Sequence, residues 1–415
     1  MTPDVPDRIA EVFKGSTIFL TGATGLVGKA LIEKILKLCD VNKIYLLIRD
    51  KKGKTPNERI KDIFSNPLYQ TVLARKPDCQ KKCIPIPGDV SLVNLGISDE
   101  NRKMLMDEVD FIIHSAATVR FDDSLKYAVT VNTRGTKFML DLAEGCSKLK
   151  VKIIPAFKDP IPGWTNNLQG PAGIFVGAGK GVIRTVYMNC DSYANFAPID
   201  CTVSAIMMYA WHYLTTKDPQ YIYNLCMPQS DLQVTWVEVL DTARDVIYNE
   251  VPFNLMLWYP DGSITQSRLY NKINTVLFQL LPALIIDLIL LIAGQKPQFL
   301  AIQNRILKGI EMYEFYITKK WNFETTSLEQ IRTGLNATEK ENYQVQSDEK
   351  DVRKFLRDCM FYLRRHFFKE TDDMLPAARR NMKILYCLDR FVKALVIGFI
   401  VYYLYKTFFL RSLHA

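Results

Sequence analysis

The chain has 415 residues, 48% of them hydrophobic, which is enough for one large domain or two domains with a sizeable core. This composition excludes intrinsic disorder for most of the chain. Its 53 lysines and arginines exceed its 44 acidic residues, giving a formal charge of +9 in short mixed runs. The charge favours an anionic partner, such as a phosphorylated cofactor, coenzyme A or a membrane surface. No nucleic acid is expected, because no known nucleic-acid-reading module is present.

The nine cysteines form no pairing pattern, and their odd number indicates reduced thiols in a cytosolic setting. Cys79 and Cys83 have the spacing of half a zinc site, but no second pair or nearby histidine completes it, so no metal site is predicted. The N-terminus lacks an apolar run of signal-peptide length, so secretion by that route is not expected.

The first predicted element is a short buried strand at residues 16–21, STIFLT. It is followed by the glycine-rich turn GATGLVG and a helical run at 29–38. Glycines at this spacing allow a tight turn and let backbone N–H groups at a helix N-terminus approach a pyrophosphate. Strand, turn and helix in this order predict a dinucleotide site. The predicted cofactor-binding residues here are Thr21, Gly22, Thr24, Gly25, Leu26, Val27 and Gly28.

A second strand at residues 43–48 ends at Arg49, about twenty residues after the glycines, where the ribose-reading residue is expected. An acidic residue there would favour NAD, whereas Arg49 with Lys51 and Lys52 suits a 2′-phosphate. NADP is therefore the predicted cofactor. The alternative interpretation is that these cations are solvated loop charges.

A third strand at 83–86 leads into GDV, and a fourth at 109–113 leads into HSAATVRFD. Small residues after the fourth strand let a cofactor lie against the backbone, at the edge where open α/β sheets bind ligands. These two strand ends add the predicted cofactor-binding residues Asp89, Val90, Ser115, Ala116 and Ala117. His114 is interpreted as a packed strand residue rather than a catalytic base. A further helix is predicted at 125–143.

Together TGATGLVGK, GDV, HSAATVRFD and the NTRGT of residues 132–136 resemble the extended short-chain dehydrogenase/reductase superfamily, and within it the fatty acyl-CoA reductases. IPGWTNNLQGPAGIFVGAGKGVIR at 161–184 and YEFYITKKWNFETT at 313–326 extend the resemblance over nearly the whole chain. The resemblance implies an α/β fold, a Rossmann-like doubly wound parallel sheet with a helical C-terminal module. It also implies that NADPH reduces a long-chain acyl-CoA to a primary alcohol through the aldehyde.

Enzymes of this kind have a serine or threonine after the fifth strand and then a helix bearing Tyr-x-x-x-Lys. The tyrosine protonates the oxygen that receives negative charge, and the lysine lowers the pKa of the tyrosine. Two pairs with this spacing, Tyr316 with Lys320 and Tyr402 with Lys406, lie far from the glycine turn in the sequence. Both are interpreted as chance, so no catalytic residue is assigned.

The interval from residue 148 to 160 is too short for a fifth strand, a helix and a sixth strand, which need on the order of 60 residues. We therefore predict that an internal segment is absent and that the sheet is truncated. The predicted join lies between Lys150 and Pro155. Such a loss would expose apolar surface, leave an unpaired strand edge and reduce stability.

Two motifs follow the predicted join. GAGKG at 177–181 does not have P-loop spacing, and two interpretations remain: a loop that approaches a coenzyme A phosphate, or a structural turn. PIDCTVSAIMMYAWHYL at 198–214 resembles the Pro-x-Asp strand end and helix that line the substrate side in this superfamily.

Two apolar stretches indicate a membrane. Residues 275–293 are long enough to span a bilayer, but Pro282 and Asp287 leave a re-entrant, interfacial or acyl-chain-lining helix pair open. Residues 391–410 predict a C-terminal transmembrane helix of the tail-anchor type, with Lys393 and Lys406 near its ends. The alternative for the second stretch is a buried C-terminal helix.

The predicted domains are an NADP-binding half at 1–150, the rest of the sheet and the substrate side at 151–300, a helical module at 301–385 and the membrane helix at 391–410. The predicted location is an intracellular membrane, endoplasmic reticulum or peroxisome, with the catalytic part facing the cytosol. Three functions remain: an alcohol-forming fatty acyl-CoA reductase, a membrane-tethered NADP-binding protein without activity, and another extended short-chain enzyme such as a sterol dehydrogenase or epimerase.

Overall fold

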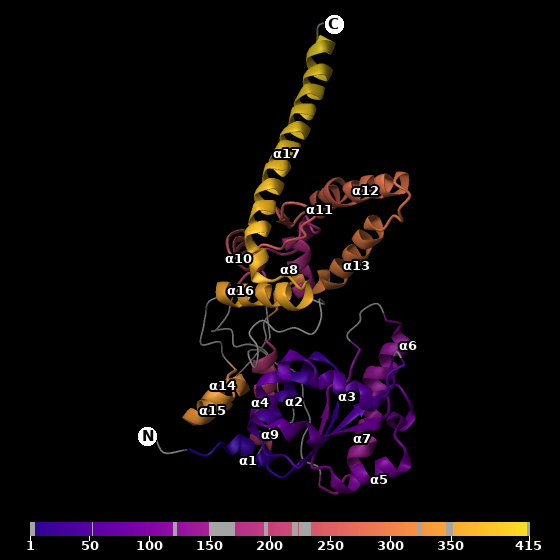
Figure 1. Cartoon of the computed structure of the whole chain (residues 1–415), viewed down its shortest axis with the longest axis vertical. Coiled ribbons are helices and arrows are strands. Elements are labelled where there is room, and N and C mark those ends of the chain that lie inside the picture. The colour runs from indigo at the N-terminus through magenta and orange to yellow at the C-terminus, as the bar shows by residue number, and fades with distance from the viewer. Residues whose placement is uncertain are drawn as a thin grey trace. The chain divides into compact units, whose positions relative to one another are not determined.

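The computed structural model describes residues 5–51, 53–118, 123–148, 171–194, 198–217, 223, 234–321, 326–345 and 352–412. The chain folds into two compact units (Figure 1). Unit 1 comprises Met1–Asn166, Asn195–Gln233 and Asn322–Lys350, and unit 2 comprises Asn167–Ala194, Val234–Trp321 and Asp351–Ala415. Each unit is therefore assembled from three separate stretches of the chain.

Unit 1 is built on a parallel sheet of four strands in the order β3-β2-β1-β4. The strands are β1 (Thr17–Thr21), β2 (Lys43–Ile48), β3 (Cys83–Pro87) and β4 (Phe111–His114). Thr21 pairs with Leu47 on one side and with His114 on the other, so the carboxyl ends of the strands form one edge. The four predicted strands and the Rossmann-like order are confirmed. Among the described residues the sheet ends at β4.

Ten α-helices are described in unit 1, and they include the continuation of the predicted run 125–143 through a π-helical turn. They are α1 (Arg8–Phe13), α2 (Leu26–Leu38), α3 (Pro56–Phe64), α4 (Gln70–Arg75), α5 (Asp99–Glu108), α6 (Leu125–Ala128), α7 (Gly135–Glu144), α9 (Ile199–Thr215), α14 (Thr326–Thr333) and α15 (Ala337–Asn342). The short turns are η1 (Pro67–Tyr69), η2 (Pro77–Lys82), η3 (Val93–Gly96) and the π-helical η4 (Val129–Arg134).

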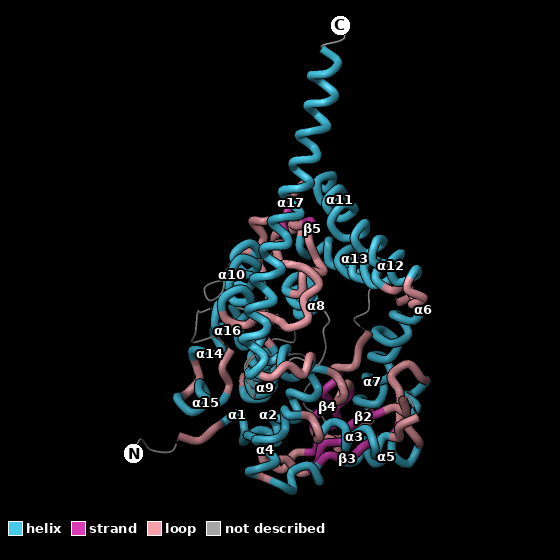
Figure 2. The backbone as a smooth tube through the Cα atoms, turned by 45° about the horizontal axis from the view of Figure 1, so that its top comes forward, coloured by secondary structure: helices cyan, strands magenta, loops and turns pink. Residues whose placement is uncertain are grey.

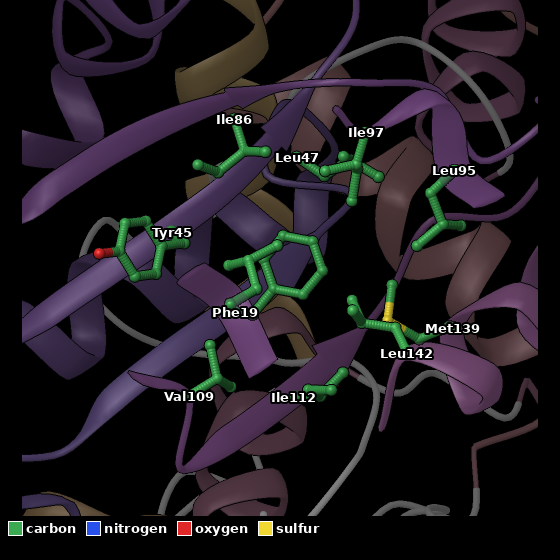
Figure 3. Close-up of a cluster of buried hydrophobic side chains, with 11 residues drawn as sticks. Phe19, Tyr45, Leu47, Ile86, Leu95, Ile97, Val109, Ile112, Met139 and Leu142 are labelled. Carbon is green, nitrogen blue, oxygen red and sulfur yellow. The ribbon is translucent and has the colours of Figure 1, made fainter. Parts of the chain in front are cut away.

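The sheet is apolar on both faces because alternate residues of each strand point to opposite sides. Phe19, Tyr45 and Ile112 belong to one buried cluster with Leu105 of α5 and Met139 of α7 (Figure 3). On the other face, α2 and α9 pack side by side and line a small apolar pocket together with strand β4. Helices therefore cover both faces of the sheet, as in doubly wound folds.

The two ends of unit 1 in the sequence are joined at α1. The Arg8 guanidinium donates to both carboxylate oxygens of Glu339, at 2.8 and 2.7 Å, and the Arg8 backbone N–H donates to Oε1 at 3.0 Å. The Glu339 side chain is fully buried and also accepts from the Asn336 N–H as part of a capping box. A buried carboxylate with this many donors fixes α15 against the first helix of the chain.

Unit 2 is mainly helical around two short parallel strands (Figure 2). Its elements are α8 (Pro171–Gly179), β5 (Thr185–Tyr187), α10 (Trp236–Asn249), β6 (Ser263–Thr265), α11 (Arg268–Thr275), η5 (Val276–Leu280), α12 (Leu281–Ile292), α13 (Phe299–Ile317), α16 (Val352–Tyr362), η6 (Leu363–Phe367), η7 (Asp372–Met374) and α17 (Leu375–Ser412).

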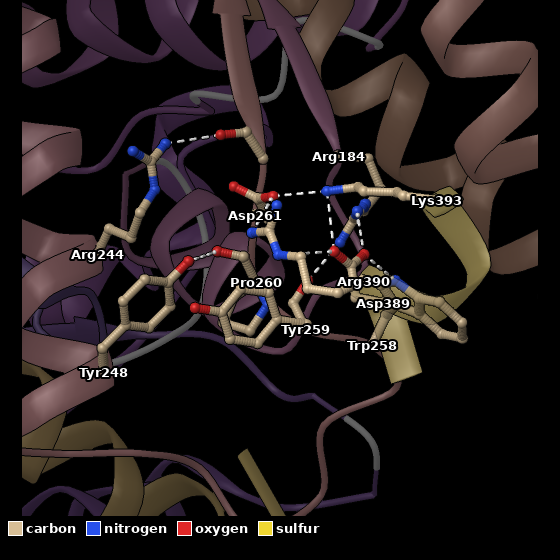
Figure 4. A network of polar contacts seen from close by, with 11 residues as sticks. Arg184, Arg244, Tyr248, Trp258, Tyr259, Pro260, Asp261, Asp389, Arg390 and Lys393 are labelled. Carbon is tan, nitrogen blue, oxygen red and sulfur yellow. Dashed lines mark hydrogen bonds and ion pairs between the residues drawn. The ribbon is translucent and has the colours of Figure 1, made fainter. Parts of the chain in front are cut away.

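A buried polar network holds the first half of α17 (Figure 4). Asp389 accepts from the indole Nε1 of Trp258 at 2.6 Å and pairs with Arg184 at 3.3 Å. Lys393 lies 2.8 Å from Asp389 and 2.6 Å from Asp261. The Asp389 side chain is 2% exposed and the Arg184 side chain 8%, so the charges depend on each other for solvation. The long helix is thus held to the rest of unit 2 at Asp389 and Lys393, close to where its apolar run begins.

Among the described residues, one helix is long and apolar enough to cross a membrane. It runs from Arg268 to Ile292 through α11, η5 and α12, with a mean hydropathy of 2.5 in its most apolar part. Only 22% of that part is buried within the protein. The predicted C-terminal membrane helix falls within α17 and remains a prediction.

The sheet core generates a stability prediction. Phe19→Ala removes a fully buried ring from the middle of β1, and we expect unfolding to cost about 3 to 5 kcal/mol less. Leu125→Ala, at a leucine that is 81% exposed, is the matched control and should change stability by about 0.5 kcal/mol or less. Urea unfolding in detergent solution, followed by far-ultraviolet circular dichroism, measures both. An equal effect of the two substitutions would contradict the placement of Phe19.

Candidate nucleotide-binding site

The glycine-rich turn joins β1 to α2 at the carboxyl edge of the sheet. The Gly25 N–H donates to the Gly22 carbonyl at 2.8 Å, and the Lys29 N–H donates to the Gly25 carbonyl at 3.2 Å. Gly25 is the N-cap of α2 and has no side chain with which to cap the helix. The N–H groups of the first helical turn are therefore left to bind an anion such as a pyrophosphate.

The turn lies so close to its neighbours that two of its glycines cannot carry a side chain. A Cβ at Gly28 would lie 2.4 Å from the Gly22 carbonyl oxygen. A Cβ at Gly22 would lie 2.8 Å from the Ala116 backbone nitrogen, and Gly22 also has a φ of +76°. Only glycine allows this approach of the turn to the end of β4. The arrangement fits the pyrophosphate of a dinucleotide.

The ends of β1 and β4 are joined by side chains rather than left free for a ligand. Thr21 Oγ1 lies 2.8 Å from His114 Nδ1, and His114 Nε2 lies 3.2 Å from Thr136 Oγ1. Ser115 donates its hydroxyl to the Thr21 carbonyl at 2.7 Å. His114 is 7% exposed, which agrees with its interpretation as a packed strand residue. Thr21 and Ser115 therefore shape the site through the backbone that they hold.

The loop after β4 is closed by Asn132, a residue that the sequence motif contains but that was not predicted as a site residue. The Thr118 N–H donates to Asn132 Oδ1 at 2.8 Å, and Asn132 Nδ2 donates to the Thr118 carbonyl at 3.0 Å. A Cβ at Gly135 would lie 2.7 Å from the Val90 carbonyl oxygen. The NTRGT motif thus bonds to the segment after β4 and packs closely against the segment after β3.

Arg49 and Asp89 form an ion pair beyond the ends of β2 and β3. Arg49 Nη1 lies 2.9 Å from Asp89 Oδ2, and the other carboxylate oxygen accepts from the Ser91 N–H at 2.9 Å. Partial burial alone would raise the pKa of Asp89, but the hydrogen bonds from Ser91 and Arg49 outweigh burial, and the pKa is lowered. The hydrogen bond to Asp89 raises the pKa of Arg49. Both groups are therefore charged at neutral pH, and the Arg49 side chain stays 44% exposed.

A second arginine, Arg59, stands beside this pair and was missed in the sequence. It lies in the first half of α3, and its Nη1 donates to the Arg49 carbonyl at 2.6 Å. Burial and, after it, the charge of Arg49 lower the pKa of Arg59. Two guanidinium groups are thus held together where the ribose of a dinucleotide is expected. The signal that could have found Arg59 is the capping box of Thr55 and Glu58, which starts α3 just before it.

The structure brings the predicted cofactor residues together. All of them lie at the carboxyl ends of β1 to β4 or in the first turn of α2: Thr21, Gly22, Thr24, Gly25, Leu26, Val27, Gly28, Arg49, Asp89, Val90, Ser115, Ala116 and Ala117. Which of them touch a cofactor remains a prediction.

Neither considered Tyr-x-x-x-Lys pair belongs to this unit. Tyr316 and Lys320 are at the end of α13, and Tyr402 and Lys406 are in α17, both in unit 2. The predicted join at 150–155 lies outside the described residues.

A third pair with the same spacing, Tyr213 and Lys217, was missed in the sequence and does lie in unit 1, at the end of α9. Close to this end of α9, the Trp211 ring lies 5.0 Å from the guanidinium carbon of Arg8, in the helix that precedes β1. This end of α9 therefore faces the amino edge of the sheet, opposite to the glycine turn, which argues against a catalytic role for the third pair. That the chain has no catalytic pair remains a prediction.

GAGKG lies at the end of α8 in unit 2 and has a structural role. A Cβ at Gly181 would lie 2.1 Å from the Trp258 carbonyl oxygen. The Lys180 ammonium lies 4.0 Å from the centre of the Phe368 ring and 3.5 Å from Glu370. Burial lowers the pKa of Lys180, although Glu370 acts in the opposite direction. Of the two interpretations, the structural turn is favoured, because the lysine charge is already engaged.

A parallel sheet with a glycine turn at its carboxyl edge and helices on both faces defines a Rossmann-like dinucleotide-binding fold. The family models described as male sterility protein match the chain at residues 20–157, 149–206 and 278–370. The chain belongs to this family, and relatives of it are named fatty acyl-CoA reductases.

Two such relatives are similar over most of their length. Fatty acyl-CoA reductase wat of Drosophila melanogaster is 27% identical, covering 95% of this chain and 93% of the relative. Fatty acyl-CoA reductase 1 of Rattus norvegicus is 25% identical, covering 91% of this chain and 89% of the relative. The alignment with the Drosophila protein runs over 484 positions, although only 95% of 415 residues take part, so roughly 90 of its positions have no residue of this chain.

Solved structures agree on the fold. The terminal R domain of the myxalamid PKS-NRPS pathway matches with a TM-score of 0.59 at 17% identity, over 88% of this chain and 96% of that domain. A thiolation-reductase di-domain from an archaeal non-ribosomal peptide synthetase matches with a TM-score of 0.53 at 15% identity, over 86% of this chain and 76% of that one.

The contact between the glycine turn and its neighbours generates a binding prediction. Gly28→Ala places a methyl group against the Gly22 carbonyl, and we expect binding of a reduced nicotinamide dinucleotide to weaken at least about tenfold, or 1.4 kcal/mol. Gly334→Ala, whose Cβ would meet nothing closer than 3.5 Å, is the control in the same unit and should bind normally. Titration of nicotinamide fluorescence measures both, and normal binding by the Gly28 variant would argue against this site.

Proposed function

We propose that this chain is an NADPH-binding member of the fatty acyl-CoA reductase family that has lost the groups that donate the catalytic proton. The observation that carries the proposal is the combination of a complete glycine site with a family match broken at one place. The match consists of two pieces, 20–157 and 149–206, which overlap where the sequence predicts the join. A chain that matches its family continuously would give one piece.

The length of the alignment with a relative supports a loss of at least the expected size. Roughly 90 alignment positions without a residue of this chain exceed the order of 60 needed for a strand, a helix and another strand. The lost part would carry the tyrosine and lysine that hold and protonate the substrate oxygen. The chain then keeps the groups that bind the dinucleotide but lacks those that complete the transition state.

The preference for NADPH over NADH rests on Arg49 and Arg59. Arg49 is exposed enough to reach a ligand, and its backbone is fixed by the guanidinium of Arg59. A 2′-phosphate would meet two positive charges there, and phosphate pairs well with a guanidinium fork. NADH presents a neutral 2′-hydroxyl in the same place and gains little from these charges.

The proposed ligand of the substrate side is a long-chain acyl-CoA, in keeping with the names of the relatives. An acyl chain partitions into lipid while its coenzyme A head remains in water. The proposed location is therefore an intracellular membrane, endoplasmic reticulum or peroxisome, with unit 1 facing the cytosol. Residues 391–410 of α17 would serve as the anchor.

Arg49 provides the test of cofactor choice. Arg49→Ala removes a charged hydrogen bond to the 2′-phosphate, so NADPH should bind about ten- to a hundredfold more weakly, while NADH binding stays the same. Arg75→Ala removes an exposed arginine of α4 in the same unit and should affect neither nucleotide. Fluorescence titrations with both nucleotides give the ratio. An equal loss for NADPH and NADH would contradict a 2′-phosphate site at Arg49.

Catalysis is tested by NADPH oxidation with palmitoyl-CoA on the purified full chain. We expect NADPH binding but no oxidation above the rate without substrate. A chain with the corresponding segment of a full-length relative inserted between Lys150 and Pro155 should regain hydride transfer. Turnover by the unmodified chain at the rate of a full-length relative would contradict the proposal of a non-catalytic protein. The chain would then be assigned the alcohol-forming function.

A further inference from the structure

The helix Arg268–Ile292 has its polarity reversed relative to a helix of a water-soluble protein. Its buried side chains are Gln279 (2% exposed), Ala283 (4%) and Asp287 (6%), spaced four residues apart along one stripe. Its large apolar side chains point outward, and Ile289 and Ile292 are 59% and 89% exposed. A surface helix normally turns its apolar stripe inward and its polar residues to water.

The exposed apolar side chains surround most of the helix rather than form one narrow face. They include consecutive residues, which point in different directions: Val276, Leu277, Phe278, Leu281, Leu284, Ile285, Ile286, Leu288, Ile289, Leu291 and Ile292. A protein partner or a second copy of the chain would cover one side of the helix and leave the apolar side chains on its other sides exposed to water. Lipid surrounds a helix on all the sides that the protein leaves open.

The one acidic side chain of this apolar segment has its carboxylate hydrogen-bonded within the protein. Asp287 Oδ1 accepts from the backbone N–H groups of Gln298 and Phe299 at 2.8 and 2.9 Å, and Oδ2 accepts from the N–H of Leu300 at 2.8 Å. These groups are the N-terminus of α13, which favours a negative charge. Asp287 therefore presents no unsatisfied charge to lipid and clamps α12 to α13.

α13 packs beside α12 and limits how the two helices can lie in a membrane. Its inner side packs on the core of unit 2 through Ile306, Ile310 and Tyr313. Its outer side carries the exposed Arg305 and Lys308 in mid-helix, followed by the exposed Glu311. If α12 crossed the bilayer, α13 would have to return beside it and bring these charges into hydrocarbon, which is costly.

We propose that α11, η5, α12 and α13 form a hairpin that lies in one leaflet of a lipid membrane, with the outer surface of α12 in the upper acyl region and the membrane not crossed. Lys272 and Lys296, just before and after the apolar segment, lie at the level of the phospholipid headgroups. The occupant of the exposed apolar surface is lipid. The proposal does not depend on the nucleotide site and would survive its failure.

Depth measurement tests the hairpin on the full chain in phosphatidylcholine–phosphatidylserine vesicles. An environment-sensitive fluorophore is attached to a single cysteine at Leu277→Cys, Leu284→Cys or Ile292→Cys, in a chain whose nine native cysteines are replaced by serine or alanine. Lipids with nitroxide groups at shallow or deep positions then quench the label. The same label at Leu125→Cys, at the 81% exposed leucine of unit 1, reports the background.

We expect all three positions to be quenched more by shallow than by deep nitroxides, at least twofold above the Leu125 background. Quenching that is deepest at Leu284 and shallow at both ends would show a crossing helix and overturn the proposal. Absence of quenching at all three positions would overturn it too, since protein rather than lipid would then cover the surface. Circular dichroism of each labelled chain confirms that it has folded.

An epitope tag at the hairpin tip, between Gly294 and Lys296, tests independently whether the hairpin crosses the membrane. In sealed microsomes the tag should be cut by added protease together with a tag placed at the N-terminus of the chain. Protection of the tip tag while the N-terminal tag is cut means that the hairpin crosses the membrane, which the proposal forbids. A tag replacing the exposed tip of the turn at Gly53 controls for accessibility on unit 1.

Discussion

The close approach of the glycine turn to the end of β4 is the constraint on which unit 1 depends. Gly22 and Gly28 have no room for a single carbon atom, because Gly28 lies against the backbone of Gly22 and Ala23, and Gly22 lies against the hydroxyl and backbone of Ser115 and the backbone of Ala116. This contact places the start of α2 directly over the carboxyl edge of the sheet. The joined side chains of Thr21, His114 and Ser115 then keep that edge in register. The nucleotide site is thus a property of the backbone, and its side chains mainly hold the backbone in place.

Unit 2 follows a different physical rule. Its buried positions include charged groups beside apolar ones, such as Arg184 with Asp389 and the carboxylate of Glu370, whereas many of its exposed side chains are large and apolar. Buried ion pairs contribute little net stability in water because of their desolvation. They do fix orientation, and here they fix the base of α17 relative to the turn at residues 258–261. The elements of unit 2 are therefore oriented by polar contacts, and its exposed aliphatic surface is the part that we propose to lie in lipid.

The sequence predicted the strands, the glycine turn and the family, because these depend on local patterns: short runs of consecutive apolar residues, glycine spacing and strand-end motifs. It did not predict Arg59, since the hydrogen bond from Arg59 to the Arg49 carbonyl joins residues whose proximity depends on the path of α3. Nor did it explain Asp287, because the three backbone N–H groups that satisfy its carboxylate belong to the start of the next helix. The pair Tyr213 and Lys217 could have been found from its spacing in the sequence and was missed. Its location could not, because only the contact of Trp211 with Arg8 indicates that this end of α9 lies at the amino edge of the sheet.

The bond between Arg8 and Glu339 has a consequence for how the chain is made. Synthesis runs from the N-terminus, so the first helix leaves the ribosome long before the carboxylate that will hold it exists. Unit 1 also needs Asn195–Gln233 and Asn322–Lys350, which emerge before and after stretches belonging to unit 2. All three stretches of unit 1 have been made once Lys350 is added, before the last stretch of unit 2, Asp351–Ala415, and no single cut in the chain separates the two units. The ribosome therefore synthesises the two units in alternating stretches, and a nascent chain of fewer than 350 residues holds incomplete parts of both.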